Sequence, residues 1–212
     1  MISGLKTRLD ALRRRRSGGG IRSSAMPGVS VALAALLWLA AAPAWAFDLP
    51  ELMGLLAKRQ HAEARFVEQR HVRGFDGPLN AAGTLSFTAP DRLVRRTTSP
   101  RAETMAVDGN NLTLTRGGRT RSMTLDSVPE LLGLVEAMRA TLAGNGTVLE
   151  RYFKPTLGGS AAQWTLDLAP VDARLAQQID AFRLSGSGGE VLGVEMQFRG
   201  GDRSVMTISP DR

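Results

Sequence analysis

Alternating apolar and polar residues fill most of the chain after residue 60 and predict antiparallel strands. Leu85 and Phe87 fall on one side of a run whose other side carries Thr84 and Ser86. A period of two is typical of a strand that buries one face. The same alternation recurs at 105–107, 112–114, 123–125, 164–168 and 192–198. Clusters of glycine, proline, aspartate and asparagine separate these runs, as turns do. The pattern predicts about ten strands.

Helical spacing predicts three helices among the strands. The first runs from Asp48 to about Gln60 and has Pro50 in its first turn, where proline is tolerated. The second starts at Ser127, which we expect to cap it, and ends at Gly144. A third, weaker one is predicted over 171–179. The apolar stripes of the first two consist of Leu52, Leu55 and Leu56, and of Leu131, Leu134, Val135, Met138 and Leu142.

These elements predict a mainly β fold with a few helices. About ten antiparallel strands with one apolar face must curl, pair with a second sheet or be covered. Three short helices cannot cover so large a sheet. We therefore expect a curved, incompletely closed antiparallel β-barrel, with helices lidding an apolar cavity on its concave face. Such a cavity has room for an apolar ligand.

The first 46 residues resemble an export signal. An apolar run over 29–42 follows a basic stretch, and Ala44-Trp45-Ala46 has the small-x-small pattern of a signal-peptidase site. The alternatives are an uncleaved membrane anchor, for which the run is somewhat short, and translation that starts at Met26. We predict a cleaved signal over 1–46, a mature domain over 47–212 and a location in the periplasm.

The net charge of the chain is concentrated in this leader. Of 27 basic and 20 acidic residues, seven basic and one acidic residue lie in 1–46, which leaves 20 and 19 for the rest. The body is therefore nearly neutral, and nucleic acid is not expected as a partner.

Residues that carry catalysis or bind metals are scarce. The chain has no cysteine, so neither disulfides nor thiolate metal sites can form. Its two histidines, His61 and His71, are ten residues apart, which is no metal-ligand spacing. Within 47–212, neither a G-x-S-x-G nor an S-x-x-K motif occurs, and the glycine clusters are typical of hairpin turns. We predict no catalytic residue, no metal and no cofactor.

The order of several short motifs resembles the LolA-type outer-membrane lipoprotein carriers. Those motifs are the stretches Phe66-Val67-Glu68-Gln69, Gly83 to Leu93, Val107 to Leu112, Ser127 to Leu132, and the late pair of strands around Gly193-Val194-Glu195-Met196, which is similar to the closing hairpin of that family. The likeness spans most of 47–209. One departure is that Ala89, not arginine, precedes Pro90, and that no tryptophan follows; Arg92 and Arg95 are the nearest basic residues. The sequence is thus more similar to a LolA-related branch than to the standard carrier.

The resemblance implies a monomeric, non-enzymatic periplasmic carrier. Its cargo would be an acylated lipoprotein or another lipid, taken from an inner-membrane donor complex or exporter and handed to an outer-membrane acceptor. We expect Arg92 and Arg95 to lie at the rim of the cavity or to contact a partner. The expected lipid-binding cavity consists of Leu52, Leu55, Leu56, Phe66, Leu85, Phe87, Met105, Leu131, Leu134, Val135, Met138 and Trp164. The alternatives are a lipid-acting enzyme and a structural or adaptor module whose barrel is filled.

Overall fold

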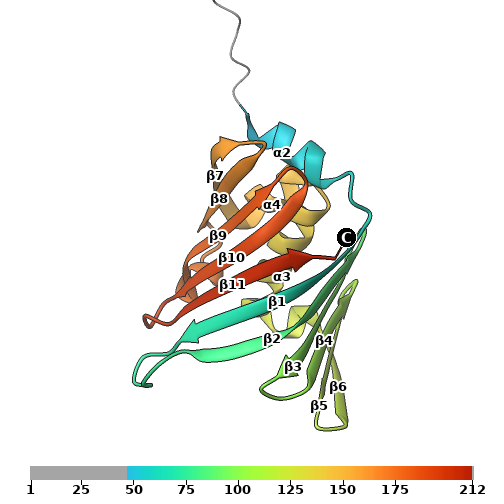
Figure 1. Cartoon of the computed structure of the whole chain (residues 1–212), viewed down its shortest axis with the longest axis vertical. Helices are drawn as coiled ribbons and strands as arrows, with labels where there is room; N and C mark the ends of the chain where they lie inside the picture. The colour runs from blue at the N-terminus through green and yellow to red at the C-terminus, as the bar shows by residue number, and fades with distance from the viewer. Residues whose placement is uncertain (1–46, 212) are drawn as a thin grey trace, which may run out of the picture. The chain divides into compact units, whose positions relative to one another are not determined.

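One antiparallel sheet of 11 strands runs through residues 47–211, the part of the chain that the computed structural model describes (Figure 1). The predicted export signal over 1–46 lies outside the described residues. The strands are β1 (His61–His71), β2 (Leu79–Thr88), β3 (Arg92–Ser99), β4 (Glu103–Asp108), β5 (Asn111–Arg116), β6 (Arg119–Thr124), β7 (Phe153–Ser160), β8 (Gln163–Pro170), β9 (Ile179–Ser187), β10 (Glu190–Phe198) and β11 (Arg203–Pro210).

Three α-helices accompany the sheet. They are α2 (Leu49–Leu56), α3 (Pro129–Leu142) and α4 (Gly146–Tyr152), and two short 3-10 turns are η1 (Leu125–Ser127) and η2 (Leu175–Gln177). In Figure 1, α3 and α4 lie on one face of the curved sheet and α2 lies across one end of it.

The strand order shows that the sheet is open. It is β6-β5-β4-β3-β2-β1-β11-β10-β9-β8-β7, so the first and last strands pair in the middle and hairpins extend outward on both sides. The edge strands β6 and β7 do not pair with each other in this sheet. The predicted fold, a curved and incompletely closed antiparallel barrel with helices against it, is confirmed.

The alternation on β1 shows which side chains face inward. Ala64, Phe66 and Glu68 are buried, whereas Arg65 and Val67 between them are exposed. Side chains two residues apart lie on the same face of a strand. The concave face of β1 is therefore apolar along most of its length and ends in a carboxylate.

The first two predicted helices are present with different ends. The first ends at Leu56 and not near Gln60, because the chain must turn to let His61 pair with Thr88 of β2. The second is capped by Val128 without a side-chain bond, so the prediction that Ser127 caps it is wrong. The Ser127 hydroxyl instead donates to the carbonyl of Thr124. Gly144 follows α3 with a φ of +69°, as predicted for a helix stop.

The remaining predictions of local structure need correction. The helix predicted over 171–179 is wrong: this segment holds only η2, and Ile179 already begins β9. The helix α4 was not predicted; the side chain of Asn145 caps it by accepting from the N–H of Val148. The described residues form 11 strands where the pattern predicted about ten.

The core consists of two hydrophobic clusters. The larger one joins α2, α4 and the strands from β7 to β11 with β1, and its fully buried centre includes Trp164, Phe153 and Phe182. The smaller one comprises Val107, Leu112, Leu125 and Val135. It lies where α3 packs against β4 and β5.

Candidate functional site

An apolar cavity of about 220 Å³ lies between α3 and the concave face of the sheet. Its wall on α3 consists of Leu131, Leu134, Val135, Met138, Thr141 and Leu142. Its wall on the sheet includes Ala62, Ala64, Leu85, Phe87, Leu93, Met105, Val107, Leu184, Val191, Val194, Met196, Met206 and Ile208. Strands from both halves of the sheet thus contribute to a single lining.

The cavity borders on both hydrophobic clusters. Ala64 and Ile208 belong to the larger cluster, Val107 and Val135 belong to the smaller one, and all four line the cavity. Protein interiors are normally packed to crystal-like density, with few voids larger than a water molecule. An apolar void of this size therefore marks a place where the side chains of the protein leave its concave face incompletely filled.

Eight of the twelve residues expected at the cavity lie in its lining. They are Leu56, Leu85, Phe87, Met105, Leu131, Leu134, Val135 and Met138. The helix α3 contributes four of these, and Leu131, Leu134 and Met138 among them are only half-buried, whereas Val135 is buried. These residues are apolar and able to contact hydrocarbon.

The other four expected residues lie outside the lining. Leu52, Phe66 and Trp164 are buried in the larger cluster, and Trp164 donates its indole N–H to the carbonyl of Gly188 at 3.0 Å. Leu55 is half-buried on α2. The spacing of these residues places their side chains on the apolar face of a helix or strand. Whether such a side chain packs into the core or lines the cavity depends on elements that are distant in sequence.

The two arginines expected at the rim have different surroundings. Arg92 is exposed, 3.9 Å from Asp108, and is not in the cavity lining. Arg95 does line the cavity, and its side chain is 31% exposed. Its guanidinium lies over the ring of Phe66, 4.8 Å from the centroid. Arg95 is therefore a cationic group on a mostly apolar wall.

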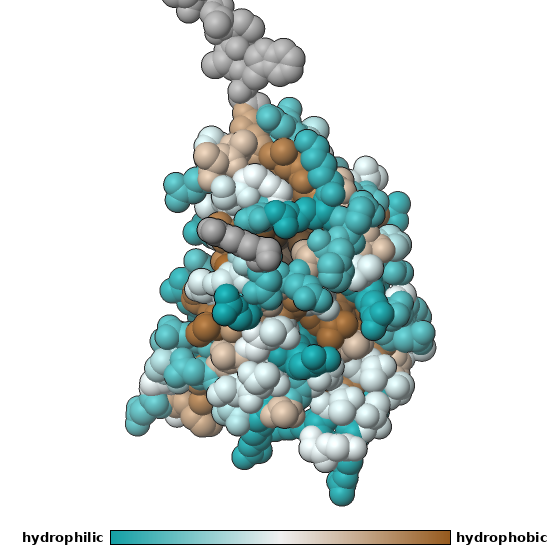
Figure 2. Space-filling model, turned by 45° about the vertical axis from the view of Figure 1, so that its right-hand side comes forward, coloured by the Kyte–Doolittle hydropathy of each residue, from teal (hydrophilic) through white to brown (hydrophobic). Residues whose placement is uncertain are grey.

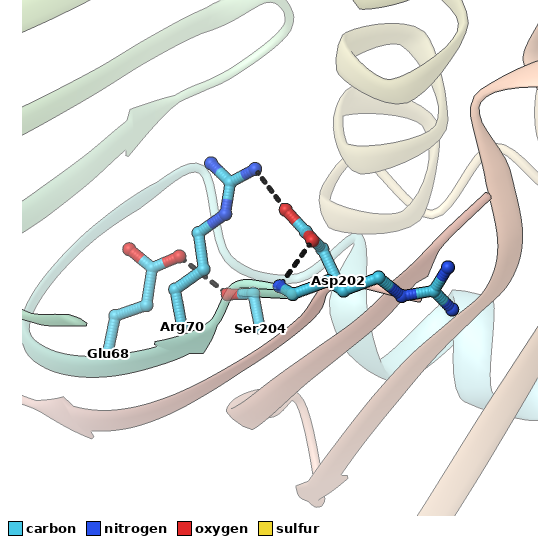
Figure 3. A network of polar contacts seen from close by, with 5 residues as sticks. Glu68, Arg70, Asp202 and Ser204 are labelled. Atoms are coloured by element: carbon cyan, nitrogen blue, oxygen red, sulfur yellow. Dashed lines mark hydrogen bonds and ion pairs between the residues drawn. The ribbon is translucent and has the colours of Figure 1, made fainter. Parts of the chain in front are cut away.

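A buried carboxylate holds Arg95 in place. Nη2 of Arg95 donates to Oε2 of Glu68 at 2.5 Å, and the hydroxyl of Ser204 donates to Oε1 at 2.6 Å. The Glu68 and Ser204 contact, between β1 and β11, is drawn in Figure 3. Both carboxylate oxygens are thereby engaged, as burial of a charge requires.

A second polar pair lies beside this carboxylate, toward the hairpin between β10 and β11 (Figure 3). Asp202 accepts from the backbone N–H of Arg73 at 3.1 Å and from the guanidinium of Arg70 at 3.2 Å. The backbone bond from Arg73 is the main reason why the pKa of Asp202 lies below its ordinary value, and Arg70 lowers it further. The guanidinium of Arg70 also lies 5.2 Å from the centre of the Phe198 ring.

The cavity also reaches α2, whose last residue, Leu56, lines it. Arg59, just after this helix, forms an ion pair with Glu190 at the start of β10, and both residues line the cavity. A Cβ added at Gly189 would lie 2.6 Å from the carbonyl oxygen of Leu55, so the β9–β10 turn approaches α2 closely. These contacts join α2 to the sheet at this end of the cavity.

A more polar hollow of about 530 Å³ lies on another side of α3. Leu132, Glu136 and Arg139 contribute to it from the helix, and Tyr152 contributes from α4. Burial, and then the nearby charge of Glu136, raise the pKa of Tyr152. Arg139 is buried and donates to the carbonyl of Gly109 at 2.6 Å, which fastens α3 to the turn between β4 and β5.

Several of the cavity residues that sequence reasoning missed come from the C-terminal strands. Leu184, Val194, Met206 and Ile208 alternate with exposed or half-buried residues, so they were recognisable as inward-facing. Their position opposite α3 was not recognisable, because it depends on the pairing of β1 with β11. Glu68 carried a signal too: it continues the inward series two residues after Phe66.

The outer surface differs from the cavity in character. On the face seen in Figure 2, hydrophobic residues show in small separate patches among hydrophilic ones. Within residues 47–211, no helix is both long enough and apolar enough to cross a membrane. In the same residues, no group of three or more histidine or acidic side chains is arranged to hold a metal ion.

Comparison with known families gives one match that covers most of the chain. Residues 41–209 match the family described as outer membrane lipoprotein carrier protein LolA-like. No curated protein shows a significant sequence match.

Solved structures similar to this chain have low sequence identity. A LolA superfamily protein from Nitrosomonas europaea is 11% identical with a TM-score of 0.42, over 76% of this chain and 89% of that one. The lipoprotein LppX from Mycobacterium tuberculosis is 11% identical with a TM-score of 0.39, over 76% and 94%. The MucA/MucB complex structure from Pseudomonas aeruginosa is 16% identical with a TM-score of 0.37, over 77% and 56%. Assignment to a family depends on the match over 41–209 alone.

Proposed function

Because this chain belongs to the LolA-like family of outer membrane lipoprotein carrier proteins, we propose that it carries acyl chains across the periplasm. The cargo is a lipoprotein or a related acylated lipid, received from a donor at the inner membrane and released to an acceptor at the outer membrane. The observation that carries the proposal is the apolar cavity between α3 and the concave sheet.

The proposed role follows from the cost of exposing hydrocarbon to water. Each methylene group transferred from water to an apolar site contributes about 0.8 kcal/mol, so a chain of about 16 carbons gains more than about 10 kcal/mol from shielding. A cavity lined by leucine, methionine, valine and phenylalanine supplies that environment. Met105, Met138, Met196 and Met206 contribute flexible side chains that adapt to ligands of irregular shape.

The cavity must widen to take a full acyl chain. Its volume of about 220 Å³ is below the ~300–1,000 Å³ of typical pockets for drug-sized ligands. We propose that α3 moves away from the sheet when cargo enters, and that Leu131, Leu134 and Met138 fill part of the space when cargo is absent. Because only α3 moves, releasing the cargo breaks fewer contacts than unfolding the whole domain would.

The export signal predicted over 1–46 supports a periplasmic location. Fractionation of cells that express the full chain, with N-terminal sequencing of the product, tests this directly. A mature N-terminus at Phe47 in the periplasmic fraction is expected. Protein retained in the cytoplasm or in the inner membrane would contradict the proposed route.

Two measurements test the carrier function. Native mass spectrometry of protein purified from the periplasm should show a co-purifying lipid, and delipidated protein should take up the neutral apolar dye N-phenyl-1-naphthylamine with increased fluorescence. Bare mass together with no dye uptake would favour a filled structural module. Turnover of lipid esters by the purified protein would favour an enzyme.

A further inference from the structure

Arg95 lines the apolar cavity and belongs to a polar group with Glu68 and Ser204, which lie behind the lining. We propose that Arg95 is a specificity residue that donates hydrogen bonds to a neutral acyl carbonyl oxygen, that of an ester or amide, on the ligand. This inference rests on the proposed carrier function and adds to it the chemistry of the ligand that the cavity selects.

The strand register explains how Arg95 reaches Glu68 across an intervening strand. Arg95 pairs with Leu85 of β2, whereas Phe66 and Glu68 of β1 pair with Gly83 and Ala81 of β2. The inward positions of β2 between the two charged groups are therefore glycine and alanine. The small side chain of Ala81 leaves space for the arginine side chain to lie over Phe66 and meet the carboxylate, whereas a Cβ at Gly83 would lie 2.0 Å from the carbonyl oxygen of Arg96.

Arg95 keeps hydrogen-bonding capacity after it has bound Glu68. A guanidinium carries five N–H donors and no acceptor. Nη2 bonds to Glu68, while Nε is buried and has no hydrogen-bond partner within residues 47–211. Neighbouring atoms cover Nε, but the side chain of Arg95 is 31% exposed and lines the cavity, so a ligand there can reach the guanidinium through its other N–H groups. Among these groups, only Nη2 has a hydrogen-bond partner within residues 47–211, so donors remain for an acceptor on the ligand.

Charge balance favours a neutral acceptor over an anionic one. The carboxylate of Glu68 offsets the positive charge of Arg95, and both of its oxygens are already used by Arg95 and Ser204. The pair of Arg95 and Glu68 therefore has no net charge, and its guanidinium still has N–H groups that can donate to a ligand. A carboxylate ligand would place a second negative charge near Glu68 in a water-poor site, whereas an ester or amide carbonyl accepts the same hydrogen bond without added charge.

The position of the polar group fits a ligand with a hydrocarbon tail. Arg95 neighbours Leu85 on β2 and Met105 on β4 in the strand register, and both of these residues line the cavity. An acyl chain lying along α3 would therefore place its first carbonyl at Arg95 while its methylene groups contact the apolar wall.

The test compares three ligands of one chain length on delipidated full-length protein: methyl dodecanoate, dodecyl methyl ether and dodecanoate. Each competes with bound N-phenyl-1-naphthylamine, and the fluorescence decrease gives its affinity. We expect the ester to bind about tenfold more tightly than the ether, as one net hydrogen bond to a charged donor allows. We expect dodecanoate to bind more weakly than the ester.

Matched variants assign the effect to Arg95. The double variant Arg95→Met/Glu68→Gln removes the donor without leaving a carboxylate unpaired, and it should bind ester and ether equally. Arg96→Met, an exposed arginine next in sequence and absent from the cavity lining, should keep the preference. Circular dichroism and thermal unfolding establish that each variant is folded.

The outcomes separate this inference from the carrier function. If the wild-type protein takes up the dye but binds the three ligands equally, or binds dodecanoate best, the assignment of Arg95 is wrong and the carrier function stands. A preference that persists in the double variant also overturns the assignment. Failure of the wild-type protein to take up the dye at all refutes the carrier function, and this inference with it.

Discussion

The substitution Leu134→Glu tests whether α3 forms the wall that contacts the ligand. Leu134 is half-buried and lines the apolar cavity. In the empty protein the introduced carboxylate can be hydrated from the cavity, so the fold should tolerate it. A ligand must remove that water, and the carboxyl group then has to be neutral.

The size of the effect follows from the cost of protonation. With a reference pKa of about 4.3 for glutamate and about 1.36 kcal/mol per pH unit, neutralising the group at pH 7 costs about 3.7 kcal/mol, or roughly 500-fold in affinity. At pH 5 the same cost is about 1 kcal/mol, or roughly fivefold. Affinity for N-phenyl-1-naphthylamine should therefore recover by about 100-fold between pH 7 and pH 5 in this variant. The wild-type protein should change little.

The control for this prediction is another leucine of the same helix. Leu132, two residues away, is also half-buried but faces the polar hollow. Leu132→Glu should retain most of the dye affinity at pH 7 and show no recovery at low pH. If folded Leu134→Glu binds the dye as well as the wild-type protein does at pH 7, α3 does not form the wall of the ligand site.

Three further predictions concern the framework of the site. Arg139→Met should lower the free energy of unfolding by about 2 kcal/mol, because α3 loses its charged hydrogen bond to Gly109; an unchanged urea midpoint would show that this bond does not fasten the helix. Gly186→Ala should prevent normal folding, since the added Cβ would lie 2.0 Å from the carbonyl oxygen of Glu190 and 2.2 Å from the Trp164 ring; wild-type tryptophan fluorescence and yield would contradict this. The lowered pKa of Asp202 stabilises the fold above the ordinary carboxyl pKa and loses this contribution as the pH falls through the lowered value. Asp202→Asn should therefore reduce stability at pH 7 and flatten its decline in acid, and an unaltered acid-unfolding curve would refute the assignment.

Local pattern was sufficient for the fold class. The period-two alternation on β2, β8 and β10 identified the strands, and the leucine stripes identified α2 and α3, because burial of one face imposes these periods on any sequence. The ends of these helices were predicted less well. Ser127 is a good N-cap residue by type, but its hydroxyl bonds to Thr124, since η1 occupies the preceding turn.

The sequence by itself determined that this chain builds an apolar concave face with too few helices to cover it. The tertiary structure alone decided which residues meet on that face. Pairing of β1 with β11 brings residues more than a hundred positions apart into one wall, and the contact between Ser204 and Glu68 is one result. The periodicity of the sequence shows which face of its own strand a residue lies on. Which residues it contacts on that face depends on the order in which distant strands pair. For that reason the sequence pattern places both Leu134 and Trp164 on an apolar face, yet only Leu134 lines the cavity.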